Sequence, residues 1–376
     1  MENKKKKKKR VKTPLIVLAA LSGTILLIVL GAYMVFNHFY NKMDYRPLNP
    51  NYVVHETVEL FTEDVTNGEV IEETSEETPE EELDAYKEAA KEALKNLGID
   101  EYDTEDVYNI LLIGSDTRVS GTAGRSDTMI LISINTNTKR IVATSFLRDL
   151  YVYIPVKDFW NKVNASYAYG GVELLIDTLN SNFSLDIDQY ISVDFYSFMK
   201  VIDILGGVDV DVQENELYWL NQYIHANNLL LKEENEFCDY LSFADGSYQH
   251  LNGKQALAYS RFRYVGNADF TRTERQRKVL NLVFEKLKSI DAVTLIELLN
   301  EFLPEVTTNV EKKTFLELLS ILPDMFNYEI VSWSIPDTQY KYITIDKVSH
   351  LGIDFEHYIT KMYTLIYTDT PYSELD

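Results

Sequence analysis

The sequence predicts an α/β protein: a single mixed-sheet domain with helices on both faces, preceded by one N-terminal transmembrane helix. One long uncharged apolar run follows a basic N-terminus. From residue 105 onward, apolar runs of strand length alternate with amphipathic helical patterns, which is typical of a layered sheet covered by helices. The first three strands are joined too tightly for parallel crossovers throughout, so we expect mixed strand directions.

The N-terminal segment predicts a membrane anchor. Eight basic residues lie between Lys4 and Lys12, and the apolar run from Leu15 to Phe36 follows them. A helix of about 22 residues is long enough to cross the hydrocarbon core. Because the basic cluster only precedes the run, we expect a cytoplasmic tail over residues 1–13, a single-pass helix over 14–37 and an exported remainder. A cleaved signal peptide is the alternative, but its apolar region is usually shorter.

Composition limits the partners of the exported part. One cysteine, Cys238, excludes an intramolecular disulfide, so stability must come from an ordinary core. Eight of the 36 basic residues and one of the 59 acidic residues precede the apolar run, which leaves a net charge of about −30 on the remainder. Such a surface does not suit nucleic acid. Beside an anchor, the lysine run indicates topology and contact with anionic membrane lipid.

Residues 38–104 are rich in Glu, Asp and Thr and are interpreted as an acidic extracytoplasmic linker. Within this linker, Thr78-Pro79 followed by Glu80 and Glu81 has the form of a helix start. The apolar face of the short helix would hold Leu83, Tyr86, Ala90 and Leu94, and Gly98 would end it. We expect this helix to have a packing or spacer role without chemistry.

Residues 105–376 are expected to form the α/β domain. Predicted strands cover Val107–Gly114, Thr128–Asn135, Thr138–Phe146, Gln189–Val193, Val208–Val212 and Tyr328–Ser334. Predicted helices cover Val172–Phe183, Phe195–Leu205 and Arg272–Lys288, with further helices near residues 291–303, 311–325 and 354–367. The segment from Glu214 to Gln249 matches no recognised motif and is interpreted as a variable loop.

Two aspartates flank the loop between the first two predicted strands. Asp116 follows the first strand and Asp127 opens the second, so both can converge at one sheet edge. Paired carboxylates with nearby hydroxyls suit a hard cation such as Mg²⁺, with water and substrate phosphate completing its coordination. The simpler interpretation is that these aspartates form turns or cap helices.

Arginines gather at the ends of the later elements. Arg148 and Asp149 follow the third strand, Arg261 and Arg263 follow a helix, and Arg272 opens the next one. We expect Arg261 and Arg263 to share one side of an extended segment, and Arg272 and Gln276 to share one helical face. Arginine at a helix N-terminus makes a sound phosphate site. The alternative is that each arginine forms an ordinary surface salt bridge.

These blocks resemble the LytR-CpsA-Psr family of cell-wall ligases. The matching motifs lie between residues 109 and 287. They are Asn109 to Asp116, Gly124 to Thr128, Arg148-Asp149, Lys162 to Ala165, Tyr169 to Gly171, Val193 to Phe195, Gly206 to Val210, Leu251 to Tyr259 and Arg272 to Gln276. This sequence departs from the family pattern at Leu147, where proline is common, and at Thr271, where glycine is common. Neither change removes a candidate ligand.

The resemblance implies an enzyme that transfers a phosphoglycan, such as wall teichoic acid or capsule, from a polyprenyl pyrophosphate carrier to peptidoglycan in a Gram-positive type envelope. Asp116 and Asp127 would hold the cation, Mg²⁺ (or Mn²⁺). The pyrophosphate would be bound by Arg118, Arg125, Arg148, Arg261, Arg263, Arg272 and Gln276. Arg148 and Asp149 are the catalytic candidates, and Asp149 could be a base for the acceptor hydroxyl or the partner that orients Arg148.

Three questions stay open at this stage. A pyrophosphatase would use the same residues. A non-catalytic regulator that binds the lipid carrier would not need both the metal ligands and the phosphate arginines, so their presence together argues against it. The prenyl tail needs an apolar groove, and most of the available residues must be core. The candidates on the predicted helices are Leu174, Leu175, Leu179, Phe183, Phe195, Phe198 and Ile202.

Overall fold

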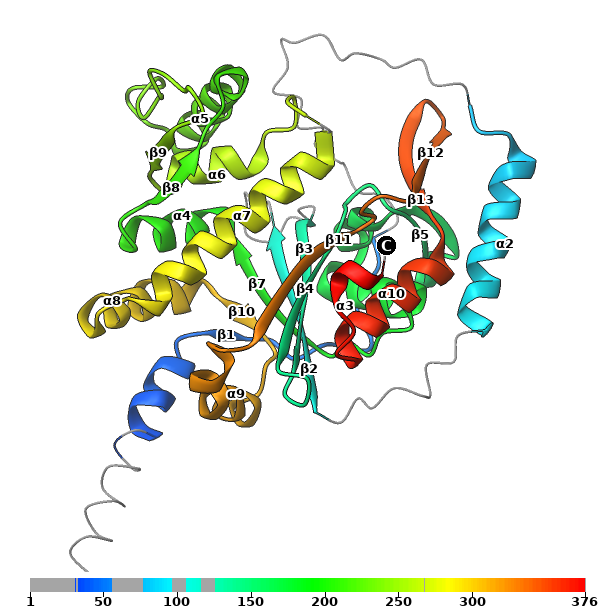
Figure 1. Cartoon of the computed structure of the whole chain (residues 1–376), viewed down its shortest axis with the longest axis horizontal. Helices are drawn as coiled ribbons and strands as arrows, with labels where there is room; N and C mark the ends of the chain where they lie inside the picture. The colour runs from blue at the N-terminus through cyan, green and yellow to red at the C-terminus, as the bar shows by residue number, and fades with distance from the viewer. Residues whose placement is uncertain are drawn as a thin grey trace, which may run out of the picture.

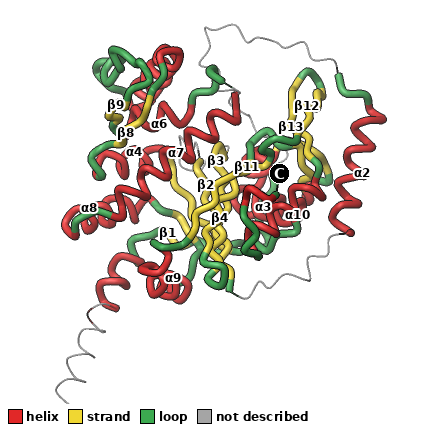
Figure 2. Tube along the Cα trace, viewed as in Figure 1, coloured by secondary structure: helices red, strands yellow, loops and turns green. Residues whose placement is uncertain are grey.

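A seven-stranded mixed sheet forms the centre of the protein (Figures 1 and 2). The computed structural model describes residues 31, 33–55, 77–96, 106–115, 126–266 and 268–375. In spatial order, the strands are β1 (Asp44–Tyr45), β10 (Thr307–Thr308), β7 (Gln189–Asp194), β2 (Val107–Ser115), β3 (Ser126–Asn135), β4 (Arg140–Phe146) and β11 (Glu329–Ile335). The α/β class and the predicted strands of this sheet are confirmed, with ends that differ by one or two residues.

Strand directions follow from the lengths of the connections. β2 pairs antiparallel with β3, and β3 with β4. The turn after Asn135, which joins β3 to β4, is far too short for a parallel crossover. β7 is parallel to β2 and β11 is parallel to β4, and each pair is joined through helices. Side chains alternate between the two faces of each strand. Leu111 and Ile113 of β2 therefore face one side of the sheet, and Leu112 faces the other.

The first face of the sheet carries the main core. It packs against α3 (Val163–Phe183) and α10 (Phe355–Tyr367), with α2 (Glu80–Asn96) beside them. The helix predicted over Val172–Phe183 corresponds only to the second half of α3. Gly170 and Gly171 have non-helical angles, with φ of +67° at Gly171, and this kink separates an earlier helical stretch that the glycine pair obscured in the sequence.

Four helices cover the second face of the sheet: α4 (Phe195–Ile204), α6 (Gly253–Arg261), α7 (Ala268–Lys288) and α8 (Ala292–Phe302). Glycine is required where α6 meets α4, because a Cβ on Gly253 would lie 2.1 Å from the carbonyl oxygen of Met199. This close approach lets α4 and α6 form one wall over the sheet. Helices therefore cover both faces, as expected.

The interpretation of residues 38–104 as a solvated linker is wrong at both of its described ends. Asp44 pairs with Thr307 of the sheet, and the Tyr40 hydroxyl donates a 2.8 Å hydrogen bond to the carbonyl oxygen of Val310. The predicted helix exists as α2, but Tyr86 and Ala90 on its apolar face lie in the main core. Large apolar side chains in these stretches have buried partners, so both stretches belong to the folded domain.

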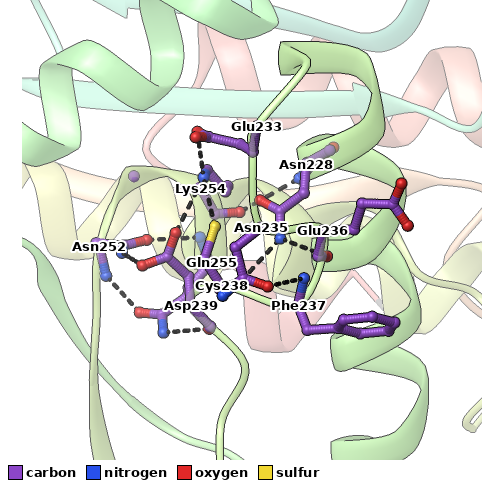
Figure 3. Close-up of polar contacts among 12 residues, drawn as sticks. Asn228, Glu233, Asn235, Glu236, Phe237, Cys238, Asp239, Asn252, Lys254 and Gln255 are labelled. Carbon is purple, nitrogen blue, oxygen red and sulfur yellow. Dashed lines mark hydrogen bonds and ion pairs between the residues drawn. The ribbon is translucent and has the colours of Figure 1, made fainter.

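The segment predicted as a variable loop, Glu214 to Gln249, is ordered by a helix and a polar network. It contains α5 (Leu217–Leu231) and ends in β9 (Tyr248–Leu251). β9 pairs with β8 (Val208–Asp211) in a separate two-stranded sheet. Figure 3 shows Lys254 between Glu233 and Asp239, at 2.8 and 2.9 Å. Leu217, Leu220 and Ile224 of α5 repeat at helical spacing and pack in a hydrophobic core, so this helix left a signal that the sequence analysis missed. The polar contacts of the loop after α5 leave no such periodicity.

Two short hairpins were not predicted. They are β5 (Tyr151–Ile154) with β6 (Phe159–Lys162), and β12 (Tyr340–Ile345) with β13 (Val348–Ile353). The helices predicted near the C-terminus are confirmed as α8, α9 (Lys312–Met325) and α10.

The expected tail over residues 1–13 and most of the expected membrane helix over 14–37 lie outside the described residues. Residues 33–40 are helical. Within the described ranges, no helix has both the length and the apolar character needed to cross a membrane.

Candidate functional site

A cavity of about 360 Å³ lies between the second face of the sheet and the helices that cover it. Its floor is apolar, since Leu112, Ile130 and Ile191 come from three neighbouring strands. The paired register places Leu112 opposite both Ile130 and Ile191, so these side chains form one row across the sheet. The apolar wall consists of Phe195, Phe198, Val201, Leu257, Leu280, Val283, Leu287, Leu298 and Phe302.

The cavity also has a cationic part. Arg148, Arg261, Arg263 and Arg272 line it together with Gln276. These residues come from the loop after β4, the end of α6, the loop that follows it and the first turns of α7. All the predicted pyrophosphate residues that the structure describes therefore meet at one cavity.

Helix α7 joins the cationic part to the apolar part. Arg272, Gln276, Leu280, Val283 and Leu287 all line the cavity, at spacings that place them on one face of the helix. Leu287 lies fifteen positions after Arg272 in α7, or about 22 Å along the helix axis. The cavity is therefore elongated, with charged and amide side chains at one end of α7 and aliphatic side chains at the other.

The expectation that Arg261 lies in an extended segment is wrong. Arg261 is the last residue of α6, and its guanidinium lies 4.4 Å from the ring centroid of Phe195. The chain becomes extended at Phe262, whose ring and carbonyl oxygen both contact the guanidinium of Arg275. Burial of Phe262 ends the helix, so Arg261 and Arg263 line the cavity from different backbone conformations.

Arg275 shows why the spacing of arginines alone does not identify ligands. It lies inside the same motif, but it points into the protein and pairs with Glu216 at 2.7 Å, with both side chains buried. Glu216 belongs to the segment predicted as a variable loop. Arg275 is therefore a structural residue that fixes α7 against the α5 region.

Asp149 lies in a cluster of cationic side chains. Its carboxylate is 2.7 Å from Lys162 Nζ and 3.8 Å from Arg148 Nε. Burial raises the pKa of the Asp149 carboxyl, but the charges of Arg148, Lys162 and Arg272 outweigh burial and hold this pKa below its usual range. Lys162 had no role in the sequence analysis, although it opens one of the matching motifs.

The predicted cation ligands are not tested by the described side chains. Asp116, Arg118 and Arg125 lie outside the described residues, and Asp127 is described only as backbone in β3. Ser115 at the end of β2 pairs with Ser126 at the start of β3, so the positions next to both aspartates share one end of the sheet. Among side chains that the structure describes, no group of three His, Cys, Asp or Glu residues could hold a metal ion.

The prenyl-groove candidates divide into two groups. Phe195 and Phe198 line the cavity. The other candidates are fully buried in the hydrophobic cores, namely Leu174, Leu175, Leu179, Phe183 and Ile202. The apolar cavity residues of α7 and α8 were not among the candidates, because a cavity-lining face and a core-facing face have the same helical period.

A family model described as the LytR_cpsA_psr family matches residues 69–361. Among curated proteins, the chain is 35% identical over 195 residues to the polyisoprenyl-teichoic acid–peptidoglycan teichoic acid transferase TagU of Bacillus licheniformis. That alignment covers 52% of this chain and 56% of the relative. The chain therefore spans about half the length of this curated relative.

Solved structures share the fold. A crystal structure of a Streptococcus agalactiae protein is 25% identical, with a TM-score of 0.57 over 71% of this chain and 88% of that chain. The Bacillus subtilis protein YwtF (TagT) with bound octaprenyl pyrophosphate lipid is 23% identical, with a TM-score of 0.50 over 71% of this chain and 93% of that chain. The family model covers six of the seven strands of the central sheet, all but β1, together with the residues that line the cavity, and the chain therefore belongs to the LytR_cpsA_psr family.

Proposed function

We propose that this protein is a membrane-anchored extracytoplasmic phosphotransferase. It would move a phosphoglycan, such as wall teichoic acid or a capsular or related polymer, from a polyprenyl pyrophosphate carrier to peptidoglycan. The observation that carries the proposal is the cavity itself, which combines arginines along its cationic part with an apolar wall along α7. Few biological ligands combine a doubly phosphorylated head with a long apolar tail, and a polyprenyl pyrophosphate does.

The named relatives support the same substrate class. TagU carries the name of a polyisoprenyl-teichoic acid–peptidoglycan transferase. YwtF, a protein of this fold, has been solved with bound octaprenyl pyrophosphate lipid. A prenyl tail occurs in both cases, and in YwtF it is joined to a pyrophosphate head, which matches the two parts of the cavity.

The transfer is a substitution at phosphorus. The acceptor hydroxyl oxygen of peptidoglycan attacks the phosphorus next to the glycan, and the bond from that phosphorus to the bridging oxygen breaks. Polyprenyl phosphate leaves, a phosphodiester forms and the hydroxyl proton passes to solvent. Negative charge grows on the bridging and leaving oxygens, so arginines placed before the reaction lower the barrier. Arg148, Arg261, Arg263 and Arg272 would supply the positive charge that neutralises it.

We assign Asp149 a positioning role and not that of a base. Its depressed pKa makes the carboxylate a weak proton acceptor. The contacts of Asp149 with Lys162 and Arg148 favour the orienting alternative, since they fix the Arg148 guanidinium that would contact the phosphate. In this proposal Arg148 touches the substrate, and Lys162 and Asp149 hold Arg148 in place.

We also propose that Asp116 and Asp127 hold Mg²⁺ (or Mn²⁺). Magnesium sites in phosphoryl-transfer enzymes use one or two carboxylates together with substrate phosphate oxygens. The pairing of Ser115 with Ser126 fits this donor set, because it brings together the end of β2, which precedes Asp116, and the start of β3, which contains Asp127. When bound, the cation would neutralise phosphate charge beside the arginines.

The cation proposal is tested by chelation and by Asp127→Ala. Each should abolish transfer by the full-length protein, and the variant should retain the parent melting temperature, because an aspartate beside a loop contributes little packing. Binding of the metal alone, measured by calorimetry, should also be lost in the variant. Full activity in the presence of chelator would remove the metal from the mechanism.

The transferase proposal is tested by incubating the purified protein with a polyprenyl pyrophosphate-linked glycan, with and without peptidoglycan. We expect polyprenyl phosphate and glycan-linked peptidoglycan to form together, and only when the acceptor is present. Equal release of polyprenyl phosphate without acceptor would identify a pyrophosphatase. Binding without turnover in either condition would identify a carrier-binding regulator.

A further inference from the structure

Helices α8 and α9 expose apolar side chains on their outer surfaces. On α8, Val293 is 75% exposed and Ile296 is 51% exposed, and on α9, Leu319 is 49% exposed. The remaining members of this surface are Leu295, Leu316, Leu322 and Phe326, each more than a third exposed. We call these seven residues the α8–α9 surface. Large apolar side chains exposed in such number at one end of a molecule are typical of an interaction site.

The α8–α9 surface adjoins the end of the N-terminal apolar run. Residues 33–40 are helical. The ring of Tyr40, the last of them, packs against the ring of Phe315 of α9, with 5.6 Å between the ring centroids. Lys312 of α9 donates hydrogen bonds to the Asn37 and Asn41 side chains at 2.6 and 2.9 Å. Figure 1 shows this helix, α8 and α9 at the same end of the molecule.

A further contact ties the same stretch to α8. Lys42 Nζ donates a 2.5 Å hydrogen bond to Asn300 Oδ1. Both helices are therefore bonded to residues 37–42, which follow Tyr33, Met34 and Val35 closely in the chain. Each of these three side chains is at least half exposed. Those three residues are the last part of the apolar run from Leu15 to Phe36.

The inner side of α8 belongs to the cavity. Leu298 and Phe302 line it, beside Leu287 of α7. α8 is therefore apolar on its cavity face and on its outer face. A helix that is apolar on opposite sides is expected in a protein core or in contact with lipid, and here one side is exposed.

We propose that the α8–α9 surface rests on the bilayer and directs the apolar end of the cavity toward the membrane. The outer side chains would enter the boundary between headgroups and acyl chains, as interfacial helices do. Glu297 and Glu301 also lie on α8, so apolar contact and the anchor hold the surface there, not attraction to anionic lipid. This proposal rests on the anchor in the proposed function, and it gives the carrier a direct route from bilayer to cavity.

The test uses the full-length protein in lipid bilayers with a nitroxide spin label at one introduced cysteine. Cys238→Ser removes the native thiol, and a melting curve confirms that this parent folds. Labels are placed by Ile296→Cys and Leu319→Cys, with Met34→Cys as the anchor control. Tyr248→Cys, at a site 74% exposed on β9, is the aqueous control. Collision rates with oxygen, which concentrates in bilayers, and with a water-soluble nickel chelate are compared.

We expect labels at positions 296 and 319 to favour oxygen, as the label at 34 does, and the label at 248 to favour the nickel chelate. If 34 favours oxygen but 296 and 319 favour nickel, the docking proposal fails and the anchor stands. A label at 34 that favours nickel overturns the anchor itself. Labels at 296 and 319 that are shielded from both reagents would overturn the docking proposal and show a protein partner, such as a second copy, on this surface.

Discussion

Arg272 is 3% exposed and lines a cavity with Arg148, Arg261 and Arg263. Guanidinium groups that share one cavity repel each other, and the Asp149 carboxylate beside Arg148 offsets some of this repulsion. An anion with several oxygens would stabilise the arrangement, and the planar fork of arginine binds two of them at once. The meeting of these four arginines in one cavity is therefore the basis for the proposed phosphate site.

Replacement of Arg272 by lysine separates a phosphate site from a salt bridge. Arg272→Lys keeps the charge but loses the fork, so the binding free energy for polyprenyl pyrophosphate should fall by about 1.5 to 3 kcal/mol. Calorimetric titration measures this change. The matched control is Arg46→Lys, because Arg46 forms an exposed pair with Asp44. Equal affinities for the two variants would exclude α7 from the phosphate site.

Asp149→Asn separates positioning from base catalysis. If Asp149 orients Arg148, the variant should bind the pyrophosphate lipid more weakly, whereas loss of a base would lower kcat and leave Kd unchanged. The depressed pKa also sets a pH dependence. The carboxylate stays ionised above its ordinary pKa of about 4 and protonates only below it. The affinity of the parent for the glycan-linked lipid, whose pyrophosphate is esterified at both ends and lacks the phosphate proton that titrates at about pH 6, should therefore stay constant between pH 7 and 5. A marked change of affinity in that interval would contradict the assigned charge.

At the scale of elements, α7 organises the site, because its N-terminal turns supply Arg272 and its C-terminal turns supply Leu287. Sequence periodicity predicted α7 and most other long elements, since their patterns extend over several turns or a whole strand. The exception is α5, a helix of 15 residues that was interpreted as part of a variable loop. Periodicity did not predict β5, β6, β12 and β13, which have four to six residues each. It also could not place Arg261, because the end of α6 depends on burial of Phe262, a tertiary contact.

The apolar part of the cavity is tested on α7 itself. Val283→Trp should fill the aliphatic end of the cavity and block the prenyl chain, while inorganic pyrophosphate should still bind near Arg272. Glu285→Trp is the control, because Glu285 is exposed on the same helix. Binding of both ligands is measured by calorimetry, with melting curves for each variant. Undiminished binding of the long-chain lipid to the folded Val283→Trp protein would place its tail elsewhere.

For the whole molecule, the relevant feature is how the chain next to the apolar run joins the domain. Asp44 pairs with the sheet and Tyr40 with Val310, so no long spacer separates residue 36 from the fold. The sequence suggested a linker there because polar composition dominates residues 38–104, and pairing of the two-residue strand β1 leaves no such signal. The cavity is thereby held close to the end of the expected anchor.

The expected membrane orientation of the whole protein can be tested. The basic cluster before the apolar run predicts a domain outside the cytoplasm. Protease added to intact protoplasts should therefore degrade the domain, and a tag fused before Lys4 should survive until the membrane is opened. Protection of the domain in sealed protoplasts would reverse the orientation and remove access to peptidoglycan.

The central claim is that one cavity holds both the pyrophosphate and the prenyl chain of a lipid carrier. A crystal structure of the protein with a polyprenyl pyrophosphate tests it most directly. The account predicts phosphate oxygens within hydrogen-bond distance of Arg148, Arg261, Arg263 and Arg272, and a prenyl chain that runs along α7 past Leu280 toward Leu287. A lipid bound outside this cavity, or one whose phosphates contact none of these arginines, would contradict the account.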